Sequence, residues 1–271
     1  MSTNRELLFK YKKEGISDAV IYFALEECNG YDHLLLSQNL DSEIKDENRF
    51  VNAMNRYLNG EMIEYIFNKA YFLAKPFYVD KSVLIPRQET EQLTVDTIVF
   101  IKKVFENGES PVIADICTGS GAIAAAIEKE VPNAKIFATD ISPEALEVAK
   151  KNVKNVELFE GNLVDPIIEI GAKLDVLICN PPYIQDETRI DEQVWKYEPH
   201  LALLASPGTK FYEEIFSKAN RIMNKHYLMA FEIEDDMEKP LIELMNKYLD
   251  DVSYRFHKDI YDKVRFLYII K

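Results

Sequence analysis

The sequence predicts an α/β protein, in which a doubly wound and mostly parallel sheet follows a small bundle of helices. Two short apolar runs, 112–116 and 135–139, are separated by a glycine turn and an alanine-rich stretch, which is the pattern of strand, loop, helix and strand. Further strand and helix patterns alternate from there to the C-terminus, whereas the first part of the chain carries only helical patterns. This order favours parallel strands joined by crossover helices, with ligands bound beyond the carboxyl ends of the strands.

The N-terminal part is predicted to form a bundle of helices. Ser17 can cap a helix that stops near Gly30, and Ser42 can cap another that runs to Gly60. The apolar stripes of these helices are explained by the core of a bundle rather than by a cofactor site.

A β-hairpin is predicted after the bundle. Residues 70–79 and 82–85 alternate in polarity around Asp80 and Lys81, which is the pattern of two strands and a turn. The predicted boundaries are therefore a helical domain over 1–75, a hairpin linker over 76–88 and an α/β domain over 89–271.

The remaining elements follow in chain order and complete the sheet. A helix over 89–105 leads to the strand that begins at Val112. Later strands are expected at 156–159, 176–179, 227–231, 252–256 and 264–270, with a helix at 237–249. The loop between the last two strands is too short for a crossover helix, so these strands must be antiparallel.

The loop from Asp115 to Gly121 is a candidate cofactor site. Its glycines let the backbone approach a ligand closely, and the helix that follows offers free N–H groups. Asp140, about 20 residues later at the end of the next strand, is expected to bind ribose hydroxyls. Gly119-x-Gly121-x-x-Ala124 also fits a nicotinamide or flavin dinucleotide, so a dehydrogenase is an alternative. Asp115 favours S-adenosylmethionine, because a carboxylate is poorly placed beside a pyrophosphate but suits a cationic amine and a sulfonium.

Asn180-Pro181-Pro182-Tyr183 follows a buried strand and is a candidate acceptor site. The prolines lack N–H groups, so the nearby carbonyls meet few competing donors. The Asn180 side-chain oxygen and a carbonyl can accept both hydrogens of an –NH2 group, while Tyr183 adds a flat face. A Pro-Pro turn leaving a core strand explains the tetrapeptide alone equally well. Beside the glycine loop, it favours a methyl acceptor site, since hydride transfer has no evident use for it.

Composition limits the partners. The formal net charge is −14, with 46 acidic and 32 basic residues, whereas a protein that makes roughly 6 to 10 phosphate contacts generally shows a basic face. This balance favours a protein substrate over a nucleic acid. No apolar run approaches the roughly 20 residues of a membrane span. Three cysteines without a C-x-x-C pair favour a reducing cytoplasm, and four scattered histidines give no metal-ligand spacing, so no metal is expected.

These segments together resemble the HemK/PrmC family of protein-(glutamine-N5) methyltransferases, which modify peptide chain release factors. The resemblance covers nearly the whole chain. It rests on Val83-Leu84-Ile85-Pro86-Arg87-Gln88-Glu89-Thr90-Glu91, the Asp115 to Gly121 loop, Asp140-Ile141-Ser142, Asn180-Pro181-Pro182-Tyr183-Ile184, and Tyr197-Glu198-Pro199 with Ala202-Leu203. The Ile-Pro-Arg segment combined with Asn-Pro-Pro-Tyr-Ile is far more specific than either the glycine loop or the tetrapeptide alone.

Three positions depart from the family pattern. Gln88 stands where the family usually has proline, and Asn162 stands where an aspartate commonly meets the adenine amino group. Asn162 still offers a side-chain oxygen as an acceptor. Glu232-Ile233-Glu234 lacks a glycine that often follows that glutamate. These differences concern the charge at the adenine and local loop geometry.

The resemblance implies a seven-stranded, Rossmann-like, S-adenosylmethionine-dependent methyltransferase sheet behind an N-terminal helical domain that recognises the substrate. It implies direct in-line transfer of the methyl group to the amide nitrogen of the glutamine in a Gly-Gly-Gln motif, by a cytoplasmic monomer whose partner is a release factor. Two alternatives remain, an S-adenosylmethionine-dependent amino-methyltransferase acting on adenine or guanine of nucleic acid, and a cofactor-binding regulator without enzymatic activity.

The site residues that the resemblance implies fall into two groups. The acceptor group is Asn180, Pro181, Pro182 and Tyr183, with Arg87 and Glu198 also at the substrate. The cofactor group is Asp115, Cys117, Thr118, Gly119, Ser120, Gly121, Asp140, Asn162, Leu163 and Asn180. For Arg87 an ordinary salt bridge is an equally good interpretation.

Overall fold

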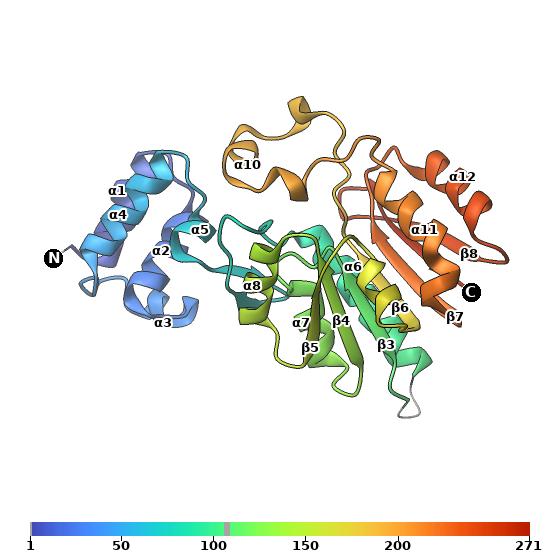
Figure 1. The fold of residues 1–271 in the computed structure, drawn as a ribbon. Coiled ribbons are helices and arrows are strands. Elements are labelled where there is room, and N and C mark those ends of the chain that lie inside the picture. The colour runs from blue at the N-terminus through green and yellow to red at the C-terminus, as the bar shows by residue number, and fades with distance from the viewer. Residues whose placement is uncertain (1, 106–108) are drawn as a thin grey trace. The chain divides into compact units, whose positions relative to one another are not determined.

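A computed structural model describes residues 2–105 and 109–271 of the chain. The chain divides into two compact units, Met1–Lys69 and Ala70–Lys271 (Figure 1). Each unit has its own buried apolar core, since none of the core clusters among the described residues combines residues from both units.

The first unit is a bundle of short helices. They are α1 (Asn4–Lys13), α2 (Asp18–Asn29), α3 (His33–Gln38), α4 (Glu47–Leu58) and α5 (Ile63–Phe67). As predicted, Ser17 caps α2 and Gly30 ends it in the left-handed conformation. The predicted cap at Ser42 is wrong, because α4 begins after Asp46, whose carboxylate accepts a hydrogen bond from the N–H of Arg49.

The second unit opens with a two-stranded hairpin of β1 (Ala70–Phe72) and β2 (Lys75–Phe77). Its turn lies at Leu73 and Ala74, both with positive φ, so the predicted turn at Asp80 and Lys81 is wrong. Neither turn residue is a glycine or an asparagine, so the sequence carries no turn signal there. Asp80 instead makes a local turn, accepting hydrogen bonds from the N–H groups of Ser82 and Val83.

A seven-stranded sheet forms the centre of the second unit. Its strands are β3 (Val112–Ile116), β4 (Lys135–Asp140), β5 (Val156–Glu160), β6 (Leu174–Cys179), β7 (Met223–Glu232), β8 (Ser253–Lys258) and β9 (Val264–Ile270). Their order is β5-β4-β3-β6-β7-β9-β8, and only β9 runs antiparallel to its neighbours β7 and β8. The predicted α/β sheet with an antiparallel last pair is confirmed.

Helices cover both faces of this sheet (Figure 1). The helices of the second unit are α6 (Gln88–Val104), α7 (Ala122–Glu130), α8 (Pro143–Asn152), α9 (Asp165–Glu169), α10 (Glu192–Tyr197), α11 (Lys210–Ile222) and α12 (Glu238–Tyr248), with short 3₁₀ turns at Glu187–Arg189 and His200–Ala202. Of these, α10 has no buried residue and lies outside both apolar clusters.

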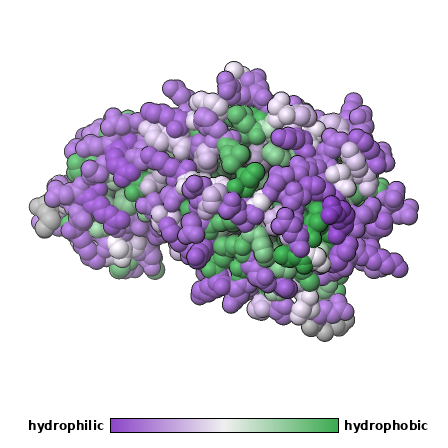
Figure 2. All heavy atoms as spheres, viewed as in Figure 1, coloured by the Kyte–Doolittle hydropathy of each residue, from purple (hydrophilic) through white to green (hydrophobic). Residues whose placement is uncertain are grey.

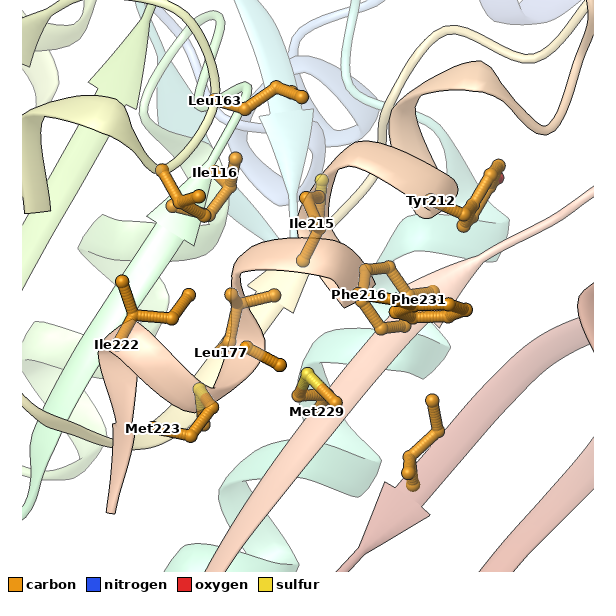
Figure 3. Packing of buried hydrophobic residues seen from close by; sticks show 14 of the residues in the cluster. Ile116, Leu163, Leu177, Tyr212, Ile215, Phe216, Ile222, Met223, Met229 and Phe231 are labelled. Atoms are coloured by element: carbon orange, nitrogen blue, oxygen red, sulfur yellow. The ribbon is translucent and has the colours of Figure 1, made fainter. Parts of the chain in front are cut away.

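The buried strand residues alternate between two apolar clusters, as a period of two requires. In β7, Leu228 packs with the α6 and α7 side, whereas Met229 packs with the α11 and α12 side. Figure 3 shows the second cluster, where Phe216 of α11 lies against Phe231 of β7, with ring centroids 5.5 Å apart. Helices therefore pack against the two faces of the sheet through two separate apolar clusters.

The surface is largely hydrophilic on the face shown in Figure 2, where apolar residues form smaller groups. None of the helices in the described ranges is both long and apolar enough to cross a bilayer.

Candidate functional site

A cavity of about 270 Å³ lies beyond the carboxyl ends of the central strands, and all its lining residues belong to the second unit. It lies where the strand order reverses between β3 and β6, which is the usual ligand position in a doubly wound sheet. The predicted residues that line it are Arg87, Cys117, Thr118, Gly119, Ser120, Asp140, Asn162, Leu163, Asn180 and Pro182. Those that do not appear in its lining are Asp115, Gly121, Pro181, Tyr183 and Glu198.

The two glycines of the loop after β3 have different tasks. Both have positive φ, 53° at Gly119 and 78° at Gly121. A Cβ on Gly119 would meet no atom within 4 Å, so its missing side chain leaves the cavity wall open to a ligand. A Cβ on Gly121 would lie 3.1 Å from the Cβ of Ala149, so this glycine lets α7 approach α8.

Asp140 joins the glycine loop to the end of β4. The N–H of Gly119 donates to Asp140 Oδ2 at 2.8 Å, and the N–H of Ser142 donates to Oδ1 at 3.0 Å. Burial raises the pKa of this carboxyl, and the backbone N–H groups of Ser142, Gly119 and Ile141 oppose that shift. A carboxylate has about four acceptor positions, so further hydroxyl groups can bind it from the cavity.

Asp115 is fully buried and supports the loop through two hydrogen bonds. Its Oδ2 accepts the Thr118 hydroxyl at 2.6 Å and the Ala124 N–H at 3.2 Å. Within the described part of the chain, Oδ1 has no hydrogen-bond partner. An unpaired buried carboxylate oxygen is costly, and protonation of the carboxyl lowers that cost.

The burial of Asp115 makes stability depend on pH. Burial raises the pKa of this carboxyl to about 7, well above the unfolded value. The native state therefore holds the proton over a range where the unfolded state has lost it, so stability falls as pH rises toward 7 and then levels off. We expect this loss to be at most about 1.4 kcal/mol per pH unit. Chemical unfolding of the cofactor-free protein at about pH 5 to about pH 8 should show it, with a flatter curve for Asp115→Asn. Parallel curves would contradict this burial effect.

Asn162 is held by a residue of α11. Its side-chain N–H group donates to Glu214 Oε1, which also accepts from Lys218 at 2.8 Å. With its nitrogen held in this way, the Asn162 oxygen is left as the acceptor toward the cavity that the residue lines. The next residue, Leu163, has a φ of 49°, and its carbonyl accepts the Thr139 hydroxyl at 2.7 Å.

Asn180 is bonded through its side-chain nitrogen. Asn180 Nδ2 donates to Thr90 Oγ1 at 3.0 Å, and the Thr90 hydroxyl donates to Glu232 Oε2 at 2.6 Å. The Tyr183 hydroxyl donates to the other oxygen of Glu232 at 3.1 Å. Burial raises the pKa of Tyr183 well above its usual range, so the phenol stays protonated as a donor. Pro181, between them in sequence, is buried.

Arg87 and Glu198 form an ion pair, with Arg87 Nη2 2.5 Å from Glu198 Oε2. The Glu198 side chain is fully buried and also accepts a hydrogen bond from the N–H of Ile85 at 3.4 Å. The pair ties the segment before α6 to the segment after α10. Arg87 itself lines the cavity, so the ion pair holds a cationic side chain at its wall.

Several cavity residues were not assigned to the site from the sequence, although some of them stand inside the motifs that carry the family resemblance. They are Phe72, Val83, Leu84, Pro86, Thr90, Ala122, Ile123, Ile141, Ser142, Pro199, Leu201, Ala202, Lys210 and Phe211. Most adjoin the motifs described above, so proximity in sequence could have indicated them. Phe72, Lys210 and Phe211 carry no such signal. In the described ranges, no three His, Cys, Asp or Glu side chains gather as metal ligands would.

Comparisons with known proteins agree with this arrangement. Residues 91–197 match the family model of the Methyltransferase small domain. The chain is 33% identical to the release factor glutamine methyltransferase of Mycoplasma mycoides, covering 97% of this chain and 96% of the relative. It is 32% identical to the protein of the same name from Bacillus subtilis, covering 96% of this chain and 88% of the relative.

Solved structures share the fold at lower identity. A methyltransferase from Pyrococcus furiosus has a TM-score of 0.50 at 20% identity, covering 81% of this chain and 98% of that chain. The N-terminal domain of human METTL16 in complex with SAH has a TM-score of 0.50 at 15% identity, covering 71% of this chain and 74% of that chain. The second unit therefore has a methyltransferase fold.

Proposed function

Because the chain belongs to the family of release factor glutamine methyltransferases, we propose that it transfers a methyl group from S-adenosylmethionine to the side-chain amide nitrogen of a glutamine in a peptide chain release factor. The observation that supports this most is the position of Asn180, whose nitrogen is bonded to Thr90 while the residue lines the cavity. The glutamine that it receives is expected to belong to a Gly-Gly-Gln motif, as in the family that the sequence resembles.

The residues present fit the cofactor. Gly119 leaves the wall open, Asp140 can accept ribose hydroxyls, and the Asn162 oxygen can accept from the adenine amino group. When bound there, S-adenosylmethionine supplies an electrophilic methyl group.

The acceptor residues must orient the amide nitrogen of the substrate glutamine, which is a poor nucleophile. An amide nitrogen shares its lone pair with the carbonyl, so attack on a methyl group is slow unless the nitrogen is held in line. We assign acceptance of its two hydrogens to Asn180 Oδ1 and to the carbonyl of Pro181. These acceptors favour positive charge on the nitrogen as the bond forms, and the proton can leave to water afterwards.

Arg87, Glu198 and Tyr183 are assigned supporting tasks. The Arg87–Glu198 pair holds a cation at the cavity wall, where it can contact the substrate backbone. Pro182 lines the cavity next to Asn180, whereas Tyr183 supports the site from outside the lining, through the bond of its hydroxyl to Glu232. We also propose that the protein acts as a cytoplasmic monomer, to which its unpaired cysteines are suited.

The test is methyl transfer from labelled cofactor to a purified release factor, with RNA and DNA in parallel reactions. We expect label in the protein, on glutamine, and none in the nucleic acids. A nucleic-acid amino-methyltransferase with the same Asn-Pro-Pro-Tyr segment is the alternative, and the net charge of −14 argues against it. Label in RNA or DNA alone would establish that alternative.

Asp140→Ala is expected to weaken S-adenosylmethionine binding roughly tenfold to a hundredfold. Hydrogen bonds to a charged acceptor contribute about 1.5 to 3 kcal/mol, and the Gly119 N–H also loses its partner. Calorimetric titration measures the change. Asp175→Ala is the control, because Asp175 binds the Val112 N–H at 2.8 Å, away from the cavity. Unchanged affinity in Asp140→Ala would remove this residue from the site, and tighter binding of a nicotinamide cofactor than of S-adenosylmethionine would favour a dehydrogenase.

A further inference from the structure

We infer that Thr90 and Glu232 are positioning residues that decide which end of the Asn180 amide faces the cavity. The inference rests on the proposed function, because the oxygen end of that amide is the one that accepts from the substrate glutamine. Neither Thr90 nor Glu232 belongs to the residues expected at the site from the sequence.

Three elements bring these groups together. Thr90 lies in the first turn of α6, Asn180 directly follows β6, and Glu232 ends β7. The distances along the chain of bonds are 3.0 Å from Asn180 Nδ2 to Thr90 Oγ1 and 2.6 Å from Thr90 Oγ1 to Glu232 Oε2. Thr90 is 6% exposed and Glu232 is 3% exposed, so the bond between them is buried, while the bond from Asn180 to Thr90 is partly buried at the cavity wall.

The direction of the bonds follows from hydrogen counting. A carboxylate can only accept, so the single hydrogen of the Thr90 hydroxyl is donated to Glu232. The Thr90 oxygen is then left as an acceptor, and the Asn180 atom that faces it must be the N–H donor. The amide oxygen is therefore at the other end. Because the oxygen and nitrogen of an amide have almost the same shape, packing alone would not make this choice.

The donors and the positive charge around Glu232 favour its carboxylate form, which is the form that accepts from Thr90. Burial raises its pKa, whereas donation by Thr90 and Tyr183 and the charge of Arg265 in β9 oppose that shift. Glu89 of α6 adds to the burial effect. Burying a carboxylate is costly unless donors satisfy it, and here both oxygens have a donor. The negative charge therefore lies on Glu232, which is separated from Asn180 by Thr90, and not on the side chain assigned to accept from the substrate.

The first experiment compares three substitutions in α6. Thr90→Val keeps the shape but removes the acceptor for Asn180, and we expect kcat on a release factor to fall at least about tenfold with the S-adenosylmethionine Kd within about twofold. Thr90→Ser keeps the hydroxyl and should retain most of the rate. Thr97→Val is the matched control, because Thr97 is also buried in α6 but its hydroxyl donates to the carbonyl of Leu93, away from the cavity. Thr97→Val should leave both kcat and the S-adenosylmethionine Kd unchanged.

A second experiment separates positioning from general destabilisation. If Thr90 acts through Asn180, Thr90→Val should cost nothing further in an Asn180→Ala background. Glu232→Gln should also lower kcat, because the amide introduced at this position can donate to Thr90 Oγ1. The hydrogen of the Thr90 hydroxyl is then free to bond to the Asn180 oxygen, which would hold that oxygen away from the cavity. A Thr90→Val rate within twofold of wild type, or an equal loss in both backgrounds, would overturn the inference.

A spectroscopic measurement tests the hydrogen bond from Asn180 to Thr90 without an activity assay. The side-chain NH2 signal of Asn180, identified by its loss in Asn180→Ala, should exchange slowly with water in the wild type and quickly in Thr90→Val. Equal exchange in the two proteins would contradict the bond to Thr90. A wild type that shows slow exchange but does not methylate a release factor would instead contradict the proposed function alone.

Discussion

Asn180→Ala is expected to lower the rate of methyl transfer by about 10²-fold or more while leaving S-adenosylmethionine affinity nearly unchanged. The substitution removes one of the two acceptors assigned to the substrate amide, and it also leaves Thr90 without its donor. It does not touch the glycine loop or Asp140. Single-turnover rates with a release factor that contains Gly-Gly-Gln, together with calorimetric titration of the cofactor, measure the two quantities separately.

Asn180→Asp discriminates between acceptance and overall polarity. It keeps an oxygen toward the cavity, but a second carboxylate oxygen replaces the nitrogen that donates to Thr90. We therefore expect a rate above that of Asn180→Ala and below that of the wild type. Wild-type rates in both variants would show that the assigned role of the Asn-Pro-Pro-Tyr segment is wrong.

Removal of residues 1–69 is expected to abolish methylation of an intact release factor while leaving cofactor binding close to wild type. All the lining residues of the cavity lie in Ala70–Lys271, and that unit contains two apolar clusters of its own. The first unit has a separate core, and none of its described residues lines the cavity, which leaves recognition of the substrate body as its proposed task. Labelled-methyl transfer and cofactor titration on the truncated protein measure both effects.

The position of the cut decides whether the α/β core and the cavity keep all their residues. A cut after residue 75, at the end of the predicted helical domain, would remove β1 and with it Phe72, which is fully buried in the α/β core and lines the cavity. The control substrate is a short peptide that contains Gly-Gly-Gln, on which the truncated and whole proteins should be equally slow. Full activity of the truncated protein on an intact release factor would disprove the recognition role.

The elements that the sequence predicts well are those defined by local patterns. The strands at 112–116 and 135–139 and the turn that carries Gly119 and Gly121 follow from apolar runs and from backbone conformations that glycine adopts easily. The cap at Ser17 follows in the same way from the residues next to it. Where two candidate signals compete, as for the helix that starts after Asp46 rather than Ser42, the local pattern does not decide.

The hairpin shows where local patterns fail. Leu73 and Ala74 adopt positive φ without being glycine, and the N–H of Leu73 donates to the Glu91 carboxylate of α6 at 2.6 Å. Tertiary contacts therefore stabilise a turn that neither residue favours by itself. Conversely, Asp80 and Lys81 look like a hairpin turn but have no paired strands around them.

The sequence by itself determined the α/β sheet, the cofactor loop and the identity of the acceptor motif, because each depends on residues adjacent in the chain. Only the tertiary structure decided which polar groups complete the site. Asn180 meets Thr90 across 90 positions, and Thr90 meets Glu232 across 142. A hydrogen bond between side chains on different elements requires their strands and helices to be placed first, and no pattern of neighbouring residues records that placement. The orientation of the Asn180 amide is thus a property of the fold, while the presence of the amide is a property of the sequence.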